Sequence, residues 1–193
     1  MRASRITTIV AVALLAASGC SSPISISNDT NQQLPPGTAP TSSTRPSNDK
    51  LVNAFDYYTR TDEYHAGYYF VSPSGSWRCV IVPRTWAGCQ SNGGSLGVQG
   101  APQTVADDSG QSVAPNAILV RTEGDPQFAS VRPEEFTPPT GAAKTLPFNK
   151  ILAAAGFRCN VQQQAGISCT SDETDKGFTF STSGAGWQYT DVP

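Results

Sequence analysis

Residues 77–91 read WRCVIVPRTWAGCQS, and residues 157–171 read FRCNVQQQAGISCTS. Both stretches open with an aromatic residue, Arg and Cys, and both close with Cys-x-Ser. Short apolar runs bounded by turn residues are typical of β-strands. The pattern therefore predicts one β-hairpin that is used twice in the chain.

Four cysteines belong to these stretches: Cys79, Cys89, Cys159 and Cys169. The fifth cysteine, Cys20, belongs to the N-terminal segment discussed below. The remaining four are an even number, which in an exported chain implies disulfides, and four cysteines allow three connectivities. The matching separations favour Cys79–Cys89 and Cys159–Cys169. Because each separation is an even number, direct pairing across two strands needs a loop of odd length or a bulge. The close C-x-x-C pairs of zinc and redox sites do not occur, so we expect no metal and no cofactor.

The remaining sequence predicts a mainly β domain. Gly contributes 17 residues and Pro 15, which favours loops and short strands. Residues 51–59 are predicted to form a short helix with Ser47 or Asn48 as its cap, and residues 151–155 are ambiguous between a helical turn and a strand. We expect a small antiparallel-sheet domain with two disulfide-closed hairpins, with a β-rich α+β fold as the alternative. Outside the hairpins, strands are predicted at residues 68–71, 117–121, 128–131, 177–181 and 187–190.

The N-terminus has the features of an export signal. Arg2 and Arg5 form a positive region, and residues 6–17 form an apolar segment that is too short to span a membrane. Residues 18–20 (SGC) resemble the bacterial lipobox, where cleavage before the Cys leaves its thiol carrying a lipid. We therefore expect a lipoprotein signal peptide over residues 1–19 and a lipid anchor on Cys20 at the extracytoplasmic face of the cell membrane. The alternative is an ordinary secretory signal with an incidental cysteine.

A polar segment separates the expected anchor from the globular domain. Residues 20–49 contain no aromatic residue and few aliphatic ones, and such a segment buries too little apolar surface to fold. Its Ser, Thr and Pro residues are typical of a spacer. From residue 50 onward Tyr, Phe and Trp become frequent. The sequence thus predicts a disordered tether over residues 20–49 and one globular domain over residues 50–193.

Several short motifs resemble a family of small exported or lipid-anchored domains of actinobacteria. Residues 70–75 (FVSPSG), followed by Cys79, resemble the family's F-x-SPSG-x-x-x-C opening. Residues 145–148 (TLPF), 166–170 (GISCT) and 177–181 (GFTFS) resemble its LPY, G-V-x-C and GF-x-x-S segments. Trp77 stands where the family often has Ile, and Phe148 where it has Tyr. The likeness covers about residues 70–181 and implies a β-rich domain of unknown function with two local disulfides. It supplies no catalytic residues.

No arrangement of residues in the sequence makes a convincing active site. The chain has one histidine, His65, and it lies upstream of Ser95, whose GGSLG context matches G-x-S-x-G but lacks the strand and helix of a nucleophile elbow. The S-x-x-K match at residues 47–50 has no S-D-N or K-T-G partner. Acidic residues gather at 107–108, 134–135 and 172–175, in segments rich in turn residues. An enzyme that uses Glu134, Glu135, Asp172 and Asp175 on envelope glycan or lipid is the alternative function.

The composition points to binding rather than catalysis. The formal net charge is −2, which gives no support for nucleic-acid binding. Trp77, Trp86 and Trp187 could form a face for stacking on sugars or docking a protein, and Trp86, in the turn at residues 83–88, is expected to point outward. The other interpretation is that the tryptophans fill the core. We expect a membrane-anchored binding or scaffolding module for an envelope glycan or protein, and a lipid carrier is a further alternative.

Overall fold

The computed structural model describes residues 48–60 and 66–193, and this part of the chain is mainly β, as predicted. The expected signal peptide, Cys20, residues 20–47 of the expected tether, and His65 lie outside the described residues. Within the described ranges, no helix has the length and apolar character needed to cross a bilayer.

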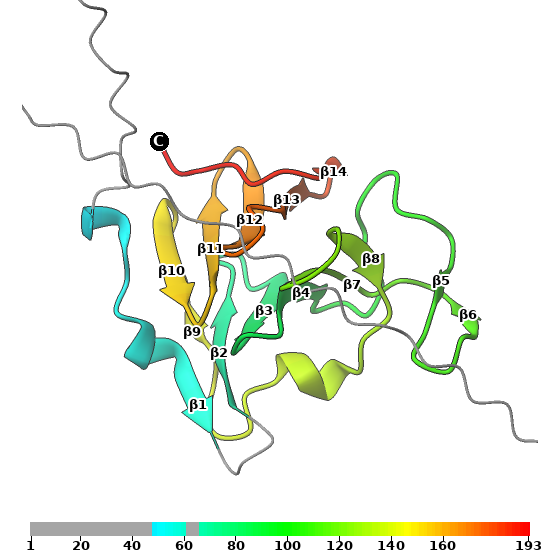
Figure 1. Ribbon diagram of the computed structural model, residues 1–193, viewed down its shortest axis with the longest axis horizontal. Coiled ribbons are helices and arrows are strands. Elements are labelled where there is room, and N and C mark those ends of the chain that lie inside the picture. Colours follow the sequence, from blue (N-terminus) through cyan, green and yellow to red (C-terminus); the bar gives the residue numbers. More distant parts are fainter. Residues whose placement is uncertain (1–47, 61–65) are drawn as a thin grey trace, which may run out of the picture. The chain divides into compact units, whose positions relative to one another are not determined.

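The first sheet has the strand order β1-β2-β3-β4-β7-β8, with β9 beside β2 (Figure 1). Neighbours along this order are antiparallel, whereas β9 runs parallel to β2. A separate ladder of β5 (Val105–Ala106) and β6 (Ser112–Val113) lies in the connection between β4 and β7. The strands of the first sheet are β1 (Tyr58–Arg60), β2 (Ala66–Val71), β3 (Trp77–Val82), β4 (Trp86–Ser91), β7 (Ala117–Arg121), β8 (Gln127–Ala129) and β9 (Lys144–Thr145).

The second sheet is an antiparallel meander in which every strand pairs with the next one in the chain. Figure 1 shows it in yellow to red beside the first sheet. Its strands are β10 (Lys150–Ala154), β11 (Phe157–Gln162), β12 (Gly166–Ser171), β13 (Gly177–Ser181) and β14 (Gly184–Gly186).

The two predicted hairpins occupy equivalent places in the two sheets. In β3–β4 the residue opposite Cys79 is Cys89, and in β11–β12 the residue opposite Cys159 is Cys169. Both pairs are disulfide-bonded, which confirms the predicted connectivity. Val82 pairs with Trp86 and Gln162 with Gly166, so each hairpin closes with a loop of three residues. The odd loop length expected from the cysteine spacing is therefore present.

Both disulfides lie in the main hydrophobic core, where the inner faces of the two sheets meet. The residues opposite the cysteines on the flanking strands are also buried: Phe70 and Leu152 on one side, Ile118 and Phe178 on the other. Strand β12 contacts both β4 and β7. Alternate side chains of both sheets fill this core, including Trp77, Ile81, Val120, Phe157, Val161, Ile167 and Phe180.

The outer faces of the two sheets differ in chemistry. The outer face of the first sheet has an apolar centre, and Phe136 of the short 3₁₀-helix η3 (Pro133–Phe136) covers that centre in a second, smaller core. The outer face of the second sheet carries polar side chains, five of which are Asn160, Gln162, Ser168, Thr170 and Thr179. Residues 188–191 are hydrogen-bonded to that polar face.

The predictions for residues 51–59 and 187–190 are wrong in part. Residues 51–59 do not form one helix: the 3₁₀-helix η2 (Ala54–Tyr57) is capped by Asn53, and β1 follows it directly. Another 3₁₀-helix, η1 (Asn48–Lys50), precedes it. Residues 187–190 are not a strand, because sheet side chains rather than a backbone ladder hold them. The ambiguous segment at residues 151–155 belongs mainly to strand β10.

Candidate functional site

The three tryptophans have different surroundings. Trp77 lies in the main core against Phe180, with ring centroids 4.6 Å apart. Trp86 is only 9% exposed and packs edge-on against Phe136. The expectation that Trp86 points outward is therefore wrong, because β4 turns this side chain into the second core. Trp187 is 50% exposed, so it is the tryptophan with the ring most available to a ligand.

Trp187 rests on the last strand of the first sheet. Its ring meets Phe128 of β8 in an edge-to-face contact with centroids 5.1 Å apart. A pocket of about 340 Å³ opens beside the indole, lined also by Asp125, Pro126 and Lys176. The Lys176 Nζ lies 2.7 Å from Asp125 Oδ1. The pocket therefore combines an exposed aromatic ring with an ion pair.

A second pocket, of about 650 Å³, lies on the outer face of the first sheet beside β8 and is lined mainly by polar groups. One edge of Trp86 reaches its wall although the ring is otherwise buried. Arg121 of β7, opposite Trp86 in the ladder, lines the same pocket and makes no ion pair with any described residue. The remaining charged groups in its wall are Asp107, Asp108, Arg132 and Glu135, of which the last two pair at 2.8 Å.

The β5–β6 hairpin that forms one wall of this pocket is held by Asp107. Its Oδ1 accepts hydrogen bonds from the Ser109 hydroxyl at 2.7 Å and from the backbone N–H groups of Ser109 and Gln111 at 2.8 and 2.9 Å. The Ser109 hydroxyl bond, followed by the backbone bonds, lowers the pKa of the Asp107 carboxyl from its ordinary value of 3.8. Hydrogen bonds to the charged form favour that form, so the carboxylate holds the turn in place over the pocket.

The segment from Asp125 to Ala129 lines both pockets, since Asp125 and Pro126 belong to one and the residues of β8 to the other. Both pockets border this segment, and we call them, together with the Phe128–Trp187 pair, the β8 surface. It is defined by Trp86, Asp107, Arg121, Asp125, Phe128, Arg132, Glu135, Lys176 and Trp187.

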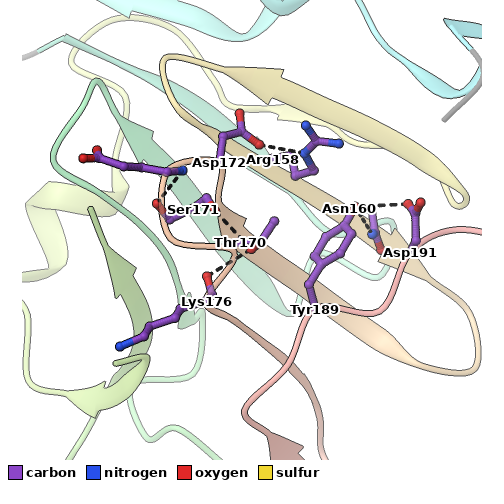
Figure 2. A network of polar contacts seen from close by, with 9 residues as sticks. Arg158, Asn160, Thr170, Ser171, Asp172, Lys176, Tyr189 and Asp191 are labelled. Carbon is purple, nitrogen blue, oxygen red and sulfur yellow. Dashed lines mark hydrogen bonds and ion pairs between the residues drawn. The ribbon is translucent and has the colours of Figure 1, made fainter. Parts of the chain in front are cut away.

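The acidic groups singled out in the sequence fall into separate places. Glu135 reaches the larger pocket of the β8 surface, whereas Asp172 and Asp175 line a pocket of about 330 Å³ on the second sheet. Figure 2 shows this second cluster, where the guanidinium of Arg158 donates to Asp172 at 2.8 Å. The Glu134, Glu135, Asp172 and Asp175 set is thus not brought to one site.

Tyr189 and Asp191 complete the cluster on the second sheet. The Tyr189 hydroxyl accepts from Asn160 Nδ2 at 2.9 Å and donates to Asp191 Oδ1 at 3.3 Å. Burial raises the pKa of Tyr189 to about 12, so the phenol stays protonated and keeps both bonds at physiological pH. In the described residues no group of three or more His, Cys, Asp or Glu side chains is arranged to hold a metal ion.

The serine motifs lack the surroundings of a catalytic nucleophile. Ser95 is exposed in a loop that follows β4, and the neighbouring Leu96 and Val98 are buried in the main core. The GGSLG stretch therefore anchors a loop on the core. Ser47 lies outside the described residues.

Comparisons of the chain with protein-family models, curated proteins and solved structures found no match. The candidate site therefore rests on the geometry of the β8 surface. Sequence reasoning missed Phe128, Arg121 and Lys176, which come together only when the ends of the two sheets meet. The signals available in the sequence are the tryptophans Trp86 and Trp187 and the acidic residue Glu135.

Proposed function

We propose that this protein is a lipid-anchored binding module of the cell envelope and that its β8 surface takes a glycan. The observation that carries the proposal is the half-exposed Trp187, held against Phe128 beside a pocket that also contains the Asp125–Lys176 ion pair. An aromatic ring beside a few convergent polar groups is the usual composition of a ligand site. The lipid anchor follows from the sequence around Cys20.

A glycan suits this surface better than an apolar ligand. Sugar rings present C–H faces that pack on an indole ring, and their hydroxyls can both donate and accept hydrogen bonds. Arg121 and Arg132 offer donors, and Asp107 and Asp125 offer acceptors. A lipid carrier would need an apolar cavity, whereas side chains of both sheets fill the space between them.

Trp187→Ala is expected to weaken glycan binding about twofold to twelvefold, because loss of an aromatic contact costs roughly 0.5–1.5 kcal/mol. The measurement is isothermal titration calorimetry of the unlipidated chain with soluble fragments of envelope polysaccharide, because its signal does not depend on the tryptophan that the substitution removes.

Phe148→Ala is the matched control for this titration. Phe148 is an aromatic residue of similar exposure, 43%, and it is not among the residues that line the pockets of the β8 surface. The affinity of the Phe148→Ala chain for the polysaccharide fragments should equal that of the unchanged chain. Equal affinities for all three proteins would remove the β8 surface as the binding site.

Cys20→Ser tests the anchor independently of the ligand. A lipidated Cys20 holds the protein in the membrane fraction, since each buried CH₂ contributes about 0.8 kcal/mol. We expect the substitution to move at least nine-tenths of the protein, by immunoblot, into the non-membrane fraction. A Cys20→Ser chain that stays membrane-bound, and an unchanged chain whose mass shows no lipid, would each contradict the anchor.

A further inference from the structure

Residues 188–191 cover the polar outer face of the second sheet, and they do so mainly through hydrogen bonds. Asn160 and Ser168 are fully buried, and Gln162 and Thr170 are 9% and 6% exposed. In the first sheet the residues at the places of Asn160 and Gln162 are Val80 and Val82, and Val80 packs in an apolar core with Phe136. Apolar packing thus covers this face in one half of the molecule, and hydrogen bonds do so in the other.

The covering segment, residues 188–191, is held mainly through its backbone carbonyls, with two further bonds to the Tyr189 and Thr190 hydroxyls. The Thr190 carbonyl accepts from both Asn160 Nδ2 and Gln162 Nε2 at 2.9 Å, and the Asp191 carbonyl accepts from Gln162 at 3.2 Å. The Thr179 hydroxyl donates to the Gln188 carbonyl at 2.8 Å. Every peptide has such carbonyls, so most of these contacts do not depend on the sequence of the bound segment.

The segment also has few buried apolar contacts. No residue from 187 to 193 is fully buried, and Figure 2 shows Tyr189 and Asp191 reaching the sheet from one side. Segments with few buried apolar contacts open at low free energy. When this segment leaves, the face it uncovers is polar and can be solvated by water, so opening leaves no bare hydrophobic surface.

We propose that the outer face of the second sheet is a recognition groove for an extended polypeptide segment of a partner, and that residues 188–191 occupy it as an internal competitor. The side-chain amides of Asn160 and Gln162 and the hydroxyl of Thr179 bind main-chain carbonyls of the incoming segment. This groove is separate from the β8 surface and does not depend on the glycan proposed there.

The test compares the full unlipidated chain with a chain that ends at Trp187. The probes are two fluorescein-labelled heptapeptides, one with the sequence of residues 187–193 and one of unrelated Ser/Thr/Asp sequence. Fluorescence anisotropy should show that the shortened chain binds both peptides with dissociation constants within about tenfold of each other. The full chain should bind each at least tenfold more weakly, because its own segment competes at high effective concentration.

Asn160→Ala combined with Gln162→Ala in the shortened chain should weaken the binding of both peptides at least tenfold. Gln103→Ala, an exposed change away from the groove and from the pockets of the β8 surface, is the control and should leave binding unchanged. Binding of the chain's own sequence alone would overturn the proposal, since it would show a tail that fits only itself. Unaltered binding by the double variant would overturn it as well.

A second measurement covers the case in which the shortened chain does not fold. The same unlabelled peptides are titrated into the full chain at millimolar concentration, and the fluorescence of Trp187, the residue that directly precedes the segment, reports the departure of residues 188–191. A saturable change with the unrelated peptide supports the groove. A flat titration with a folded full chain overturns it.

Discussion

Gly166→Ala should leave little of the protein folded. Gly166 has φ +93°, a left-handed conformation in which an L side chain is strained by roughly 1–2 kcal/mol. A Cβ there would also collide with the carbonyl group of Phe180 and the Cβ of Ser181 on the neighbouring strand. Since the colliding atoms include backbone, they cannot easily move aside. We expect the free energy of unfolding to fall by about 5 kcal/mol or more, comparable to the whole stability of many domains. Urea denaturation followed by tryptophan fluorescence measures it.

Gly156→Ala is the matched control, because it separates backbone strain from collision. Gly156 has almost the same φ, +90°, but a Cβ there would meet no atom within 4 Å. We expect its free energy of unfolding to fall by only about 1–2 kcal/mol. Similar losses for both substitutions would show that strand β13 does not approach Gly166 as closely as described.

Replacing Cys159 and Cys169 together by Ser should lower the free energy of unfolding by about 3 kcal/mol. A crosslink between residues ten apart mainly restricts the unfolded chain, and loop-closure entropy gives about this value. For a domain of this size the melting temperature should fall by roughly 6–12 °C. Differential scanning calorimetry of the unlipidated chain measures the change.

The Cys79→Ser, Cys89→Ser double variant provides the comparison. Its disulfide has the same sequence separation of 10, and its cysteines are equally buried. The loop-closure argument therefore predicts a loss within about 1 kcal/mol of the other pair. Losses that differ by several kcal/mol would mean that packing around the sulfur atoms, rather than chain entropy, dominates.

The hairpins could be predicted from sequence because their determinants are local. The residues that decide β3–β4 and β11–β12 lie within 15 consecutive positions in each case, and the even cysteine separation required the odd loop that is present. Strands β7 and β13 have the predicted limits for the same reason. An alternating apolar pattern with turns at both ends contains most of the information that such a strand needs.

Other features depend on distant contacts that the sequence does not reveal. The expected helix at residues 51–59 gives way to β1 because Tyr58 pairs with Tyr68 of β2. Trp86 lies in a turn region, yet it is buried because Phe136, fifty residues later, packs against it. The β8 surface combines residues from both halves of the chain, so a local pattern could identify its aromatic ring but not its pockets.

Both disulfides are short-range, and this affects when each of them can form during folding. Each joins residues ten positions apart, whereas a bond between the two halves would have to close a loop of 70 to 90 residues. Closing a loop eight times longer costs about 1.8 kcal/mol more, at about 0.6 kcal/mol for each doubling. Native partners therefore meet roughly twentyfold more often than wrong ones. Oxidation can proceed one hairpin at a time as the chain emerges, with little need for reshuffling by an isomerase.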